Sequence, residues 1–130
     1  MNQEVEKYLG VDWGEIRIGL ALADSETKLA TPFRVAKSLK EVLAAIKEEE
    51  IDKIIIGAPK KMFDSKLRMS NDYLKFLDLL KSKVKIPVVE VDERLSSQAA
   101  DSLVGDKKTK APRDALAAML ILQSFLDRNT

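Results

Sequence analysis

The sequence predicts an α/β fold in which one mixed five-stranded sheet is flanked by helices. Three segments with strand-like patterns come first and are joined by short turns, which is typical of an antiparallel meander. Two further apolar strands then alternate with helical segments, which favours parallel strands in the same sheet. With 130 residues the chain has room for one domain, expected over residues 1–130, and for one core of ordinary size.

The three meander strands are predicted at Val5 to Val11, Ile16 to Ala23 and Leu29 to Val35. In the second, two sets of side chains alternate, with Ile16, Ile18, Leu20 and Leu22 on one face and Arg17, Gly19, Ala21 and Ala23 on the other. The small side chains of the second set predict that another element packs closely against that face. Pro32 places the third strand near an edge or a bulge.

Helices and strands alternate in the next part of the chain. Ser38 and Glu41 form a capping-box pattern, and apolar residues then recur at helical spacing. Lys53 to Gly57 is a short apolar strand of the kind that is buried on both faces. Ser70 can cap a second helix, and Pro87 to Val91 is predicted as another buried strand.

The last third of the chain is predicted to be mainly helical. A short helix is expected from Ser96 or Ser97 through Leu103, followed by a loop over residues 105–110. Pro112 suits the first position of a final helix that runs through Leu126. The first turns of this helix are apolar nearly all round, which predicts burial on several sides.

Two residue types are missing from the composition, and their absence restricts the chemistry. The chain has no Cys, which excludes disulfides, thiolate zinc sites and cysteine nucleophiles. It also has no His, which removes the usual general base, the Ser-His-Asp triad and the commonest transition-metal ligand. Catalysis would depend on carboxylates, Lys, Tyr, hydroxyls or a hard cation. Mg²⁺ or Mn²⁺ held by Asp and Glu oxygens fits best.

The distribution of apolar and charged residues points to a cytoplasmic protein that binds no membrane. Met1 to Lys7 is polar and acidic, unlike a secretory signal, and no apolar run approaches the roughly 20 residues that span a bilayer. The net charge is only +1, yet basic residues crowd two segments. These are Lys60, Lys61, Lys66 and Arg68 in one, and Lys107, Lys108, Lys110 and Arg113 in the other. Such patches suit contact with phosphates, and solvated loops are the alternative interpretation.

Acidic residues stand at the ends of predicted elements, where sites in α/β sheets form. Asp12 ends the first strand, Asp92 and Glu93 end the last one, and Asp114 lies in the first turn of the final helix. If the first and last strands are near neighbours, these carboxylates can converge. Clustered carboxylates repel one another unless a cation is present. A divalent metal would relieve that repulsion and would supply hydroxide and charge stabilisation for phosphodiester hydrolysis.

Each of the three candidate ligands also has a purely structural interpretation. Asp12 could stabilise a turn, and Glu93 could form a surface ion pair that contributes little stability. Asp114 is favoured at a helix N-terminus by about 0.3–1 kcal/mol without any catalysis. The hypothesis of a site therefore rests on the three carboxylates as a set, together with the missing His.

Four segments of the chain carry recognisable motifs. They are Leu9 to Ala21 (LGVDWG, then RIGLA), Ile56 to Pro59 (IGAP), Asp92 to Ala100 (DERLSSQAA) and Asp114 to Gln123 (DALAA, then ILQ). In this order and spacing they resemble the motifs of the YqgF family, also called RuvX. The resemblance spans nearly the whole chain and implies a ribonuclease H-like fold related to the Holliday-junction resolvase RuvC.

The resemblance also implies a site and a reaction. It maps the metal-binding, catalytic acidic residues of the family onto Asp12, Glu93 and Asp114, with Mg²⁺ or Mn²⁺ as the cofactor. The reaction implied is phosphodiester hydrolysis, either in maturation of the 5′ end of 16S ribosomal RNA or at branched DNA. The residues predicted to contact nucleic acid are Arg17, Lys60, Lys61, Arg94, Lys107, Lys108, Lys110 and Arg113.

Several functions remain open at this point. The first is a metal-dependent endonuclease that acts on structured RNA in ribosome biogenesis. A DNA-junction resolvase would share the chemistry and act as a symmetric homodimer. A non-catalytic nucleic-acid-binding module for ribosome assembly is favoured by the modest basic charge and by the segment Lys60 to Ser65, which lacks the glycines usual in the family. A nucleotide-binding half of the sugar kinase and actin type would need a second lobe.

Overall fold

The computed structural model describes residues 5–58, 71–92 and 112–128, and its centre is a five-stranded sheet. The strands are β1 (Lys7–Asp12), β2 (Ile18–Asp24), β3 (Thr31–Ala36), β4 (Lys53–Ala58) and β5 (Val88–Asp92). Their order across the sheet is β3-β2-β1-β4-β5. The pairs β1–β2 and β2–β3 are antiparallel, and the pairs β1–β4 and β4–β5 are parallel. The predicted mixed sheet of a meander plus two parallel strands is confirmed.

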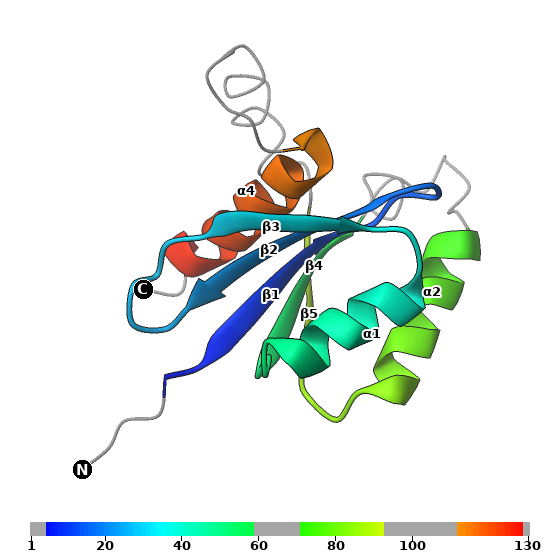
Figure 1. Cartoon of the computed structure of the whole chain (residues 1–130), viewed down its shortest axis with the longest axis horizontal. Coiled ribbons are helices and arrows are strands. Elements are labelled where there is room, and N and C mark those ends of the chain that lie inside the picture. The colour runs from blue at the N-terminus through cyan, green and yellow to red at the C-terminus, as the bar shows by residue number, and fades with distance from the viewer. Residues whose placement is uncertain (1–4, 59–70, 93–111, 129–130) are drawn as a thin grey trace.

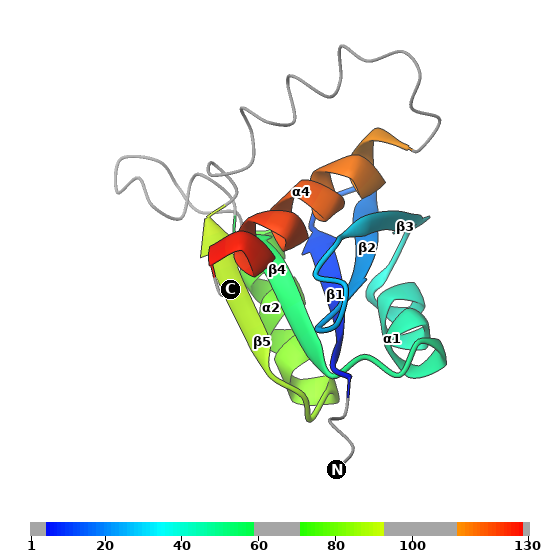
Figure 2. The same ribbon diagram turned by 90° about the vertical axis from the view of Figure 1, so that its left-hand side faces the viewer.

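Helices cover both faces of the sheet (Figure 1). One face carries α1 (Leu39–Glu48) and α2 (Asn71–Lys83), and the other carries α4 (Arg113–Arg128). Figure 2 shows α4 running along one side of the sheet while α1 and α2 lie on the opposite side. Because α4 contacts β1, β2, β3 and β4, this single helix covers most of its face. In the described part of the chain, no helix has the length and apolarity needed to cross a bilayer.

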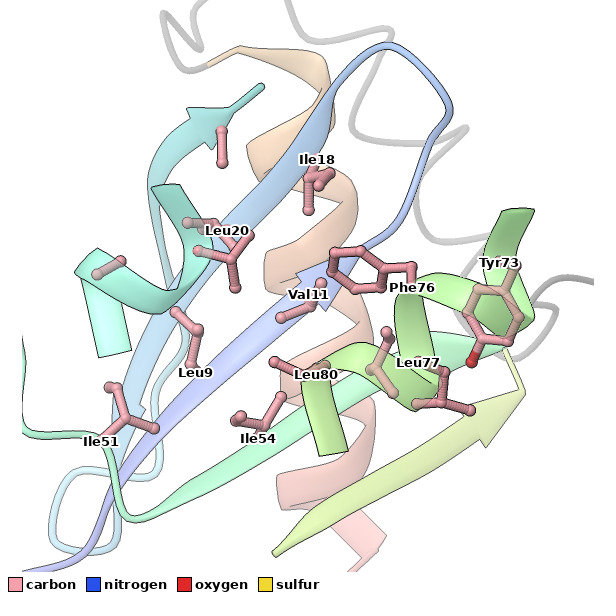
Figure 3. Close-up of a cluster of buried hydrophobic side chains, with 14 of the residues drawn as sticks. Leu9, Val11, Ile18, Leu20, Ile51, Ile54, Tyr73, Phe76, Leu77 and Leu80 are labelled. Atoms are coloured by element: carbon pink, nitrogen blue, oxygen red, sulfur yellow. The ribbon is translucent and has the colours of Figure 1, made fainter. Parts of the chain in front are cut away.

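Two layers of buried side chains follow from the period-two alternation of the strands. Leu9, Val11, Ile18 and Leu20 point to the α1 and α2 side, where α2 adds Tyr73, Phe76, Leu77 and Leu80 (Figure 3). Ala21 and Ala23 point the other way and pack with Ile121 and Leu122 of α4. The predicted small-residue face of β2 is therefore the surface on which α4 lies. Ile54, Ile55 and Ile56 are fully buried, which confirms that β4 is covered on both faces.

The predicted cap of α1 is confirmed with one difference. The hydroxyl of Ser38 accepts a hydrogen bond from the backbone N–H of Glu41 at 3.3 Å. The carboxylate of Glu41 accepts from the N–H of Lys37 rather than from that of Ser38. The bond to Ser38 satisfies a backbone donor that the first turn of a helix leaves unpaired, whereas the bond to Glu41 satisfies the donor of the residue before the cap.

The sequence-based expectations were wrong at several positions. The second strand begins at Ile18, and Ile16 lies outside it with 80% of its surface exposed. The first strand begins at Lys7 and the third at Thr31, both later than predicted. Val5 and Leu29, which lie outside these strands, are exposed. The strand at residues 88–92 is not buried: it is an edge strand whose residues are half-buried or exposed, because β5 has β4 as its neighbour on one side only.

The final helix is buried along one face rather than all round. Ala115, Ala118 and Leu122 are fully buried against the sheet, whereas Ala117 and Leu120 are half-buried. Pro32 lies on the edge strand β3, where the register of β2 and β3 shifts between Leu20 and Ala21. The predicted cap at Ser70, the short helix at 96–103 and the loop at 105–110 lie outside the described residues.

Candidate functional site

The pairing of β1 with β2 places Asp12 opposite Gly19, at the end of the hairpin where β1 stops and β2 begins. Directly opposed residues of an antiparallel pair have side chains on the same face of the sheet. Gly10, two residues before Asp12, faces α4, because a Cβ added there would lie 2.8 Å from the Cβ of Leu122. The side chain of Asp12 therefore also leaves the sheet on the α4 side.

The first turn of α4 sits directly on Gly19. A Cβ added at Gly19 would overlap the carbonyl oxygen of Asp114 and would lie 3.0 Å from the backbone nitrogen of Ala115. Glycine is therefore needed at this position because two backbones approach one another closely. The consequence is that Asp12 and Asp114, 102 positions apart in the sequence, both border the same glycine.

Arg17 supplies the positive charge of this end of the molecule. Its guanidinium Nη1 lies 3.9 Å from Oδ2 of Asp114, and the two side chains are 69% and 36% exposed. An ion pair of this length and exposure contributes little to stability. Arg17 and Asp114 also line an open cleft of about 430 Å³, together with Gly14, Glu15 and Ile16. Charged side chains thus border a volume that solvent fills.

An aromatic cluster supports this end of β1 from the opposite face of the sheet. Trp13 follows Asp12 directly, and its ring packs edge-on against that of Tyr73, with centroids 5.7 Å apart. The ring of Trp13 also packs against that of Phe76, with centroids 6.5 Å apart. The hydroxyl of buried Tyr73 donates a hydrogen bond to Oε1 of Glu90 on β5 at 3.0 Å. Through α2, the cluster connects the end of β1 to β5.

The ends of β1 and β5 lie at one edge of the sheet, because β1, β4 and β5 are parallel. Asp12 is level with Gly57 of β4, and Gly57 is level with Val91 of β5. β4 therefore lies between the first and the last strand. At the usual spacing of strands, β1 and β5 are about 10 Å apart. Asp92 is the last residue of β5.

The structure brings together Asp12, Asp114 and Arg17 from the predicted site, and it places Arg113 exposed at the first position of α4. The other predicted residues lie outside the described ranges, namely Glu93, Lys60, Lys61, Arg94, Lys107, Lys108 and Lys110. Within residues 5–58, 71–92 and 112–128, no three acidic side chains are close enough to hold a metal ion. The predicted set of three ligands thus has two members in the described part of the chain.

The donor chemistry of this edge suits a hard divalent cation. Carboxylate oxygens are the ligands that Mg²⁺ and Mn²⁺ prefer, and Mg²⁺ commonly takes one or two of them and completes its shell with water. Asp114 lines the open cleft and Asp12 is paired with Gly19, on which the first turn of α4 lies, so the two residues can supply two such groups. The residues present therefore fit a divalent metal.

The cleft includes residues that the sequence analysis did not assign to a site. Gly14, Glu15 and Ile16 line it, although the alternation in the sequence predicts Ile16 on the same strand face as Ile18 and Leu20. The same alternation does place Arg17 and Gly19 on one face, which is the face that meets Asp114. No local pattern signals the aromatic cluster, because Trp13 and Tyr73 are 60 positions apart.

Comparison with known proteins gives a consistent result. The sequence profile of the RuvX family, described as Holliday junction resolvase, matches residues 6–128. A protein of Natranaerobius thermophilus is 35% identical, with 94% of each chain covered, and one of Chlamydia abortus is 38% identical, with 98% of this chain and 95% of the other covered. Both are named as candidate pre-16S rRNA nucleases.

A solved structure with the same architecture is that of T. thermophilus RuvC in complex with Holliday junction substrate. It aligns with a TM-score of 0.60 over 95% of each chain, at 15% sequence identity. At this identity the similarity concerns the fold alone. The predicted ribonuclease H-like fold is confirmed.

Proposed function

Because this chain belongs to the RuvX family, we propose that it is a divalent-metal-dependent endonuclease that hydrolyses phosphodiester bonds in precursor 16S ribosomal RNA. We take residues 1–130 as one nuclease domain. The observation that supports the proposal is the approach of the backbone of Asp114 to Gly19, the residue that pairs with Asp12. The names of the related proteins favour precursor rRNA as the substrate.

The roles of the residues follow from their chemistry. Asp12 and Asp114 would hold the metal, and a bound divalent ion supplies an activated water and stabilises charge on the phosphoryl oxygen. Arg17, exposed beside Asp114, would contact a phosphate of the substrate backbone. No side-chain general base is required in this chemistry, which suits a chain without His.

Glu93 is the proposed third ligand. It is bonded to Asp92, the last residue of β5, and consecutive Cα atoms lie about 3.8 Å apart. Val89 and Val91 pack on the α4 side of the sheet, whereas Glu90 meets Tyr73 on the other side. At the end of β5, Val91 therefore projects on the same side of the sheet as Asp12.

The test is cleavage of a synthetic precursor 16S rRNA 5′ segment during titration with Mg²⁺ or Mn²⁺. We expect cleavage to depend on the metal and to be lost in Asp12→Asn and Glu93→Gln. Asp78→Asn, at an exposed position on α2, is the matched control and should cleave at the wild-type rate. Full activity of a clean Asp12→Asn preparation would overturn the proposal.

Two alternatives give different results in the same assay. A junction resolvase would cut four-way DNA junctions rather than the precursor RNA and would be a symmetric dimer in solution. A non-catalytic assembly module would bind RNA in a salt-dependent manner and show no metal-dependent turnover. Either result would overturn the assignment to precursor rRNA processing.

A further inference from the structure

The hairpin tip between β1 and β2 exposes an isoleucine. Ile16 is 80% exposed, more than the other large exposed hydrophobic residues of the described chain, which are Val5, Leu29 and Leu79. Burial of an isoleucine side chain is worth about 1.5–3 kcal/mol, and Ile16 gains almost none of this in the folded chain. Single exposed apolar residues are common, however, so exposure alone does not indicate a function.

The position of Ile16 beside the proposed site indicates a function for its exposed side chain. It lines the same cleft of about 430 Å³ as Arg17 and Asp114. An apolar side chain, a guanidinium and a proposed metal ligand thus border one volume. Glu15 lines this cleft too, and its charge disfavours a phosphate at the tip of the hairpin. An uncharged, apolar group is therefore the ligand that best fits beside Ile16.

The hairpin holds Ile16 in a defined place. Its two strands are paired up to Asp12 and Gly19, so only six residues form the connection. At its start Trp13 packs on Tyr73 and Phe76 of α2. Gly14 allows the chain to turn tightly, because a Cβ there would lie 2.6 Å from the carbonyl oxygen of Arg17. The side chain of Ile16 therefore projects from a connection anchored at both ends.

We propose that Ile16 packs against the face of an unpaired nucleobase next to the phosphate that is cut, while Arg17 contacts the adjoining backbone. Apolar side chains contact base faces where bases are unstacked, and such contacts do not depend on the base identity. A base inside a continuous duplex has both faces covered by its neighbours. The inference rests on the proposed nuclease function and adds a substrate class: strands with an unpaired nucleotide at the cleavage step.

Binding can be measured without cleavage in an Asp12→Asn background. The probe is an oligonucleotide with 2-aminopurine beside the mapped cleavage position, prepared with that base unpaired and with it fully paired. We expect Ile16→Ala to weaken binding of the unpaired form about 5- to 10-fold, to remove its fluorescence change and to leave binding of the paired form unaltered. Leu29→Ala, which removes a 65% exposed side chain outside this cleft, should change neither.

The outcome separates this inference from the proposed function. Equal effects of Ile16→Ala on paired and unpaired probes would overturn the base contact even if Asp12→Asn abolishes cleavage. Cleavage retained by Asp12→Asn would overturn the nuclease assignment whatever Ile16→Ala does. The probe is prepared as RNA and as DNA of the same sequence. The form that binds more tightly shows whether the unpaired base belongs to RNA or to DNA. Since Ile16 is exposed, Ile16→Ala should unfold at the wild-type temperature.

Discussion

An acidic residue lies at each end of β2, and the two residues have different partners. At the end of the strand, Oδ1 of Asp24 accepts hydrogen bonds from the N–H of Glu26, the N–H of Thr27 and the hydroxyl of Thr27, at 3.0, 2.7 and 3.1 Å. At the start, Asp114 of α4 lies over Gly19, and its charged partner within the described residues is Arg17 at 3.9 Å. The first carboxylate closes a turn, and the second lines a cleft.

Hydrogen bonding distinguishes a structural carboxylate from a candidate ligand. The backbone hydrogen bond from Thr27, with the further bonds in the turn, lowers the pKa of Asp24 below its usual value. All three bonds are accepted by Oδ1 of Asp24 in the folded state. Asp114 instead forms a long, exposed ion pair with Arg17. Because such a pair contributes little to stability, a metal can take the place of Arg17 beside Asp114, or a phosphate the place of Asp114 beside Arg17, at small cost. The same residue type thus stabilises one end and remains available for ligands at the other.

The largest expected effect is on catalysis. Asp114→Asn should reduce cleavage about 100- to 1,000-fold, since it removes a proposed ligand of the metal that would stabilise the transition state, while the unfolding temperature changes little. Asp24→Asn should do the opposite, lowering the unfolding temperature and leaving the cleavage rate of the folded protein unaltered. Parallel rate and melting measurements check both. Equal activity losses in the two variants would contradict the distinction between the two ends.

The next effect concerns the backbone approach at Gly19. Gly19→Ala should cost about 3 kcal/mol of unfolding free energy and most of the cleavage activity, since the new methyl group would overlap the carbonyl of Asp114. Gly10→Ala is the matched control on the same face. Its methyl group would meet the side chain of Leu122 and the carbonyl of Ala118, farther from the cleft. It should lower stability in urea titrations by a similar amount and activity by less.

A smaller effect is expected from the aromatic cluster. Tyr73→Phe keeps the ring against Trp13 and removes the hydrogen bond to Glu90, with an expected loss of about 1 kcal/mol of unfolding free energy. Because this bond connects β5 to the end of β1, the Mg²⁺ concentration for half-maximal cleavage should also rise severalfold.

The control is Tyr8→Phe, at the far end of the molecule. It removes a hydroxyl that donates to Glu6 at 3.2 Å in an exposed position. This variant should keep the wild-type Mg²⁺ requirement. If Tyr8→Phe and Tyr73→Phe shift the metal requirement equally, the cluster has no specific role at the site.

The smallest effect is a pH dependence of stability. Because the folded pKa of Asp24 is lowered, its contribution is fully present above the unfolded value near 3.8 and is lost as the pH falls through the folded value. Wild-type protein should therefore lose stability more steeply than Asp24→Asn as the pH drops below about 4. Urea titrations between pH 5 and 2.5 check this, and identical pH profiles would contradict it.

Much of the fold could be predicted because local periodicity encodes burial. Ile18 and Leu20 alternate with Gly19 and Ala21, and the two sets face the two predicted sides of the sheet. The burial of β5 was predicted wrongly because an apolar run does not reveal whether a strand has one neighbour or two. The strand order depends on contacts between segments distant in the sequence.

The candidate site could be predicted in part because the ends of helices and strands can be located in the sequence. Asp12 and Asp114 were identified by their places at element ends, and the structure brings both to Gly19. The alternation predicts that Ile16 belongs to the second strand, yet the pairing with β1 ends at Gly19 and the strand begins at Ile18. A pattern does not reveal where pairing stops.

The proposed site consists of Asp12 and Asp114 holding a divalent metal at the edge of the sheet. A crystal of the protein soaked in Mn²⁺ can be measured at a wavelength where manganese scatters anomalously. We expect an anomalous peak between the two carboxylates, with metal–oxygen distances of about 2.1 Å. Saturating Mn²⁺ with no peak between Asp12 and Asp114 would contradict it.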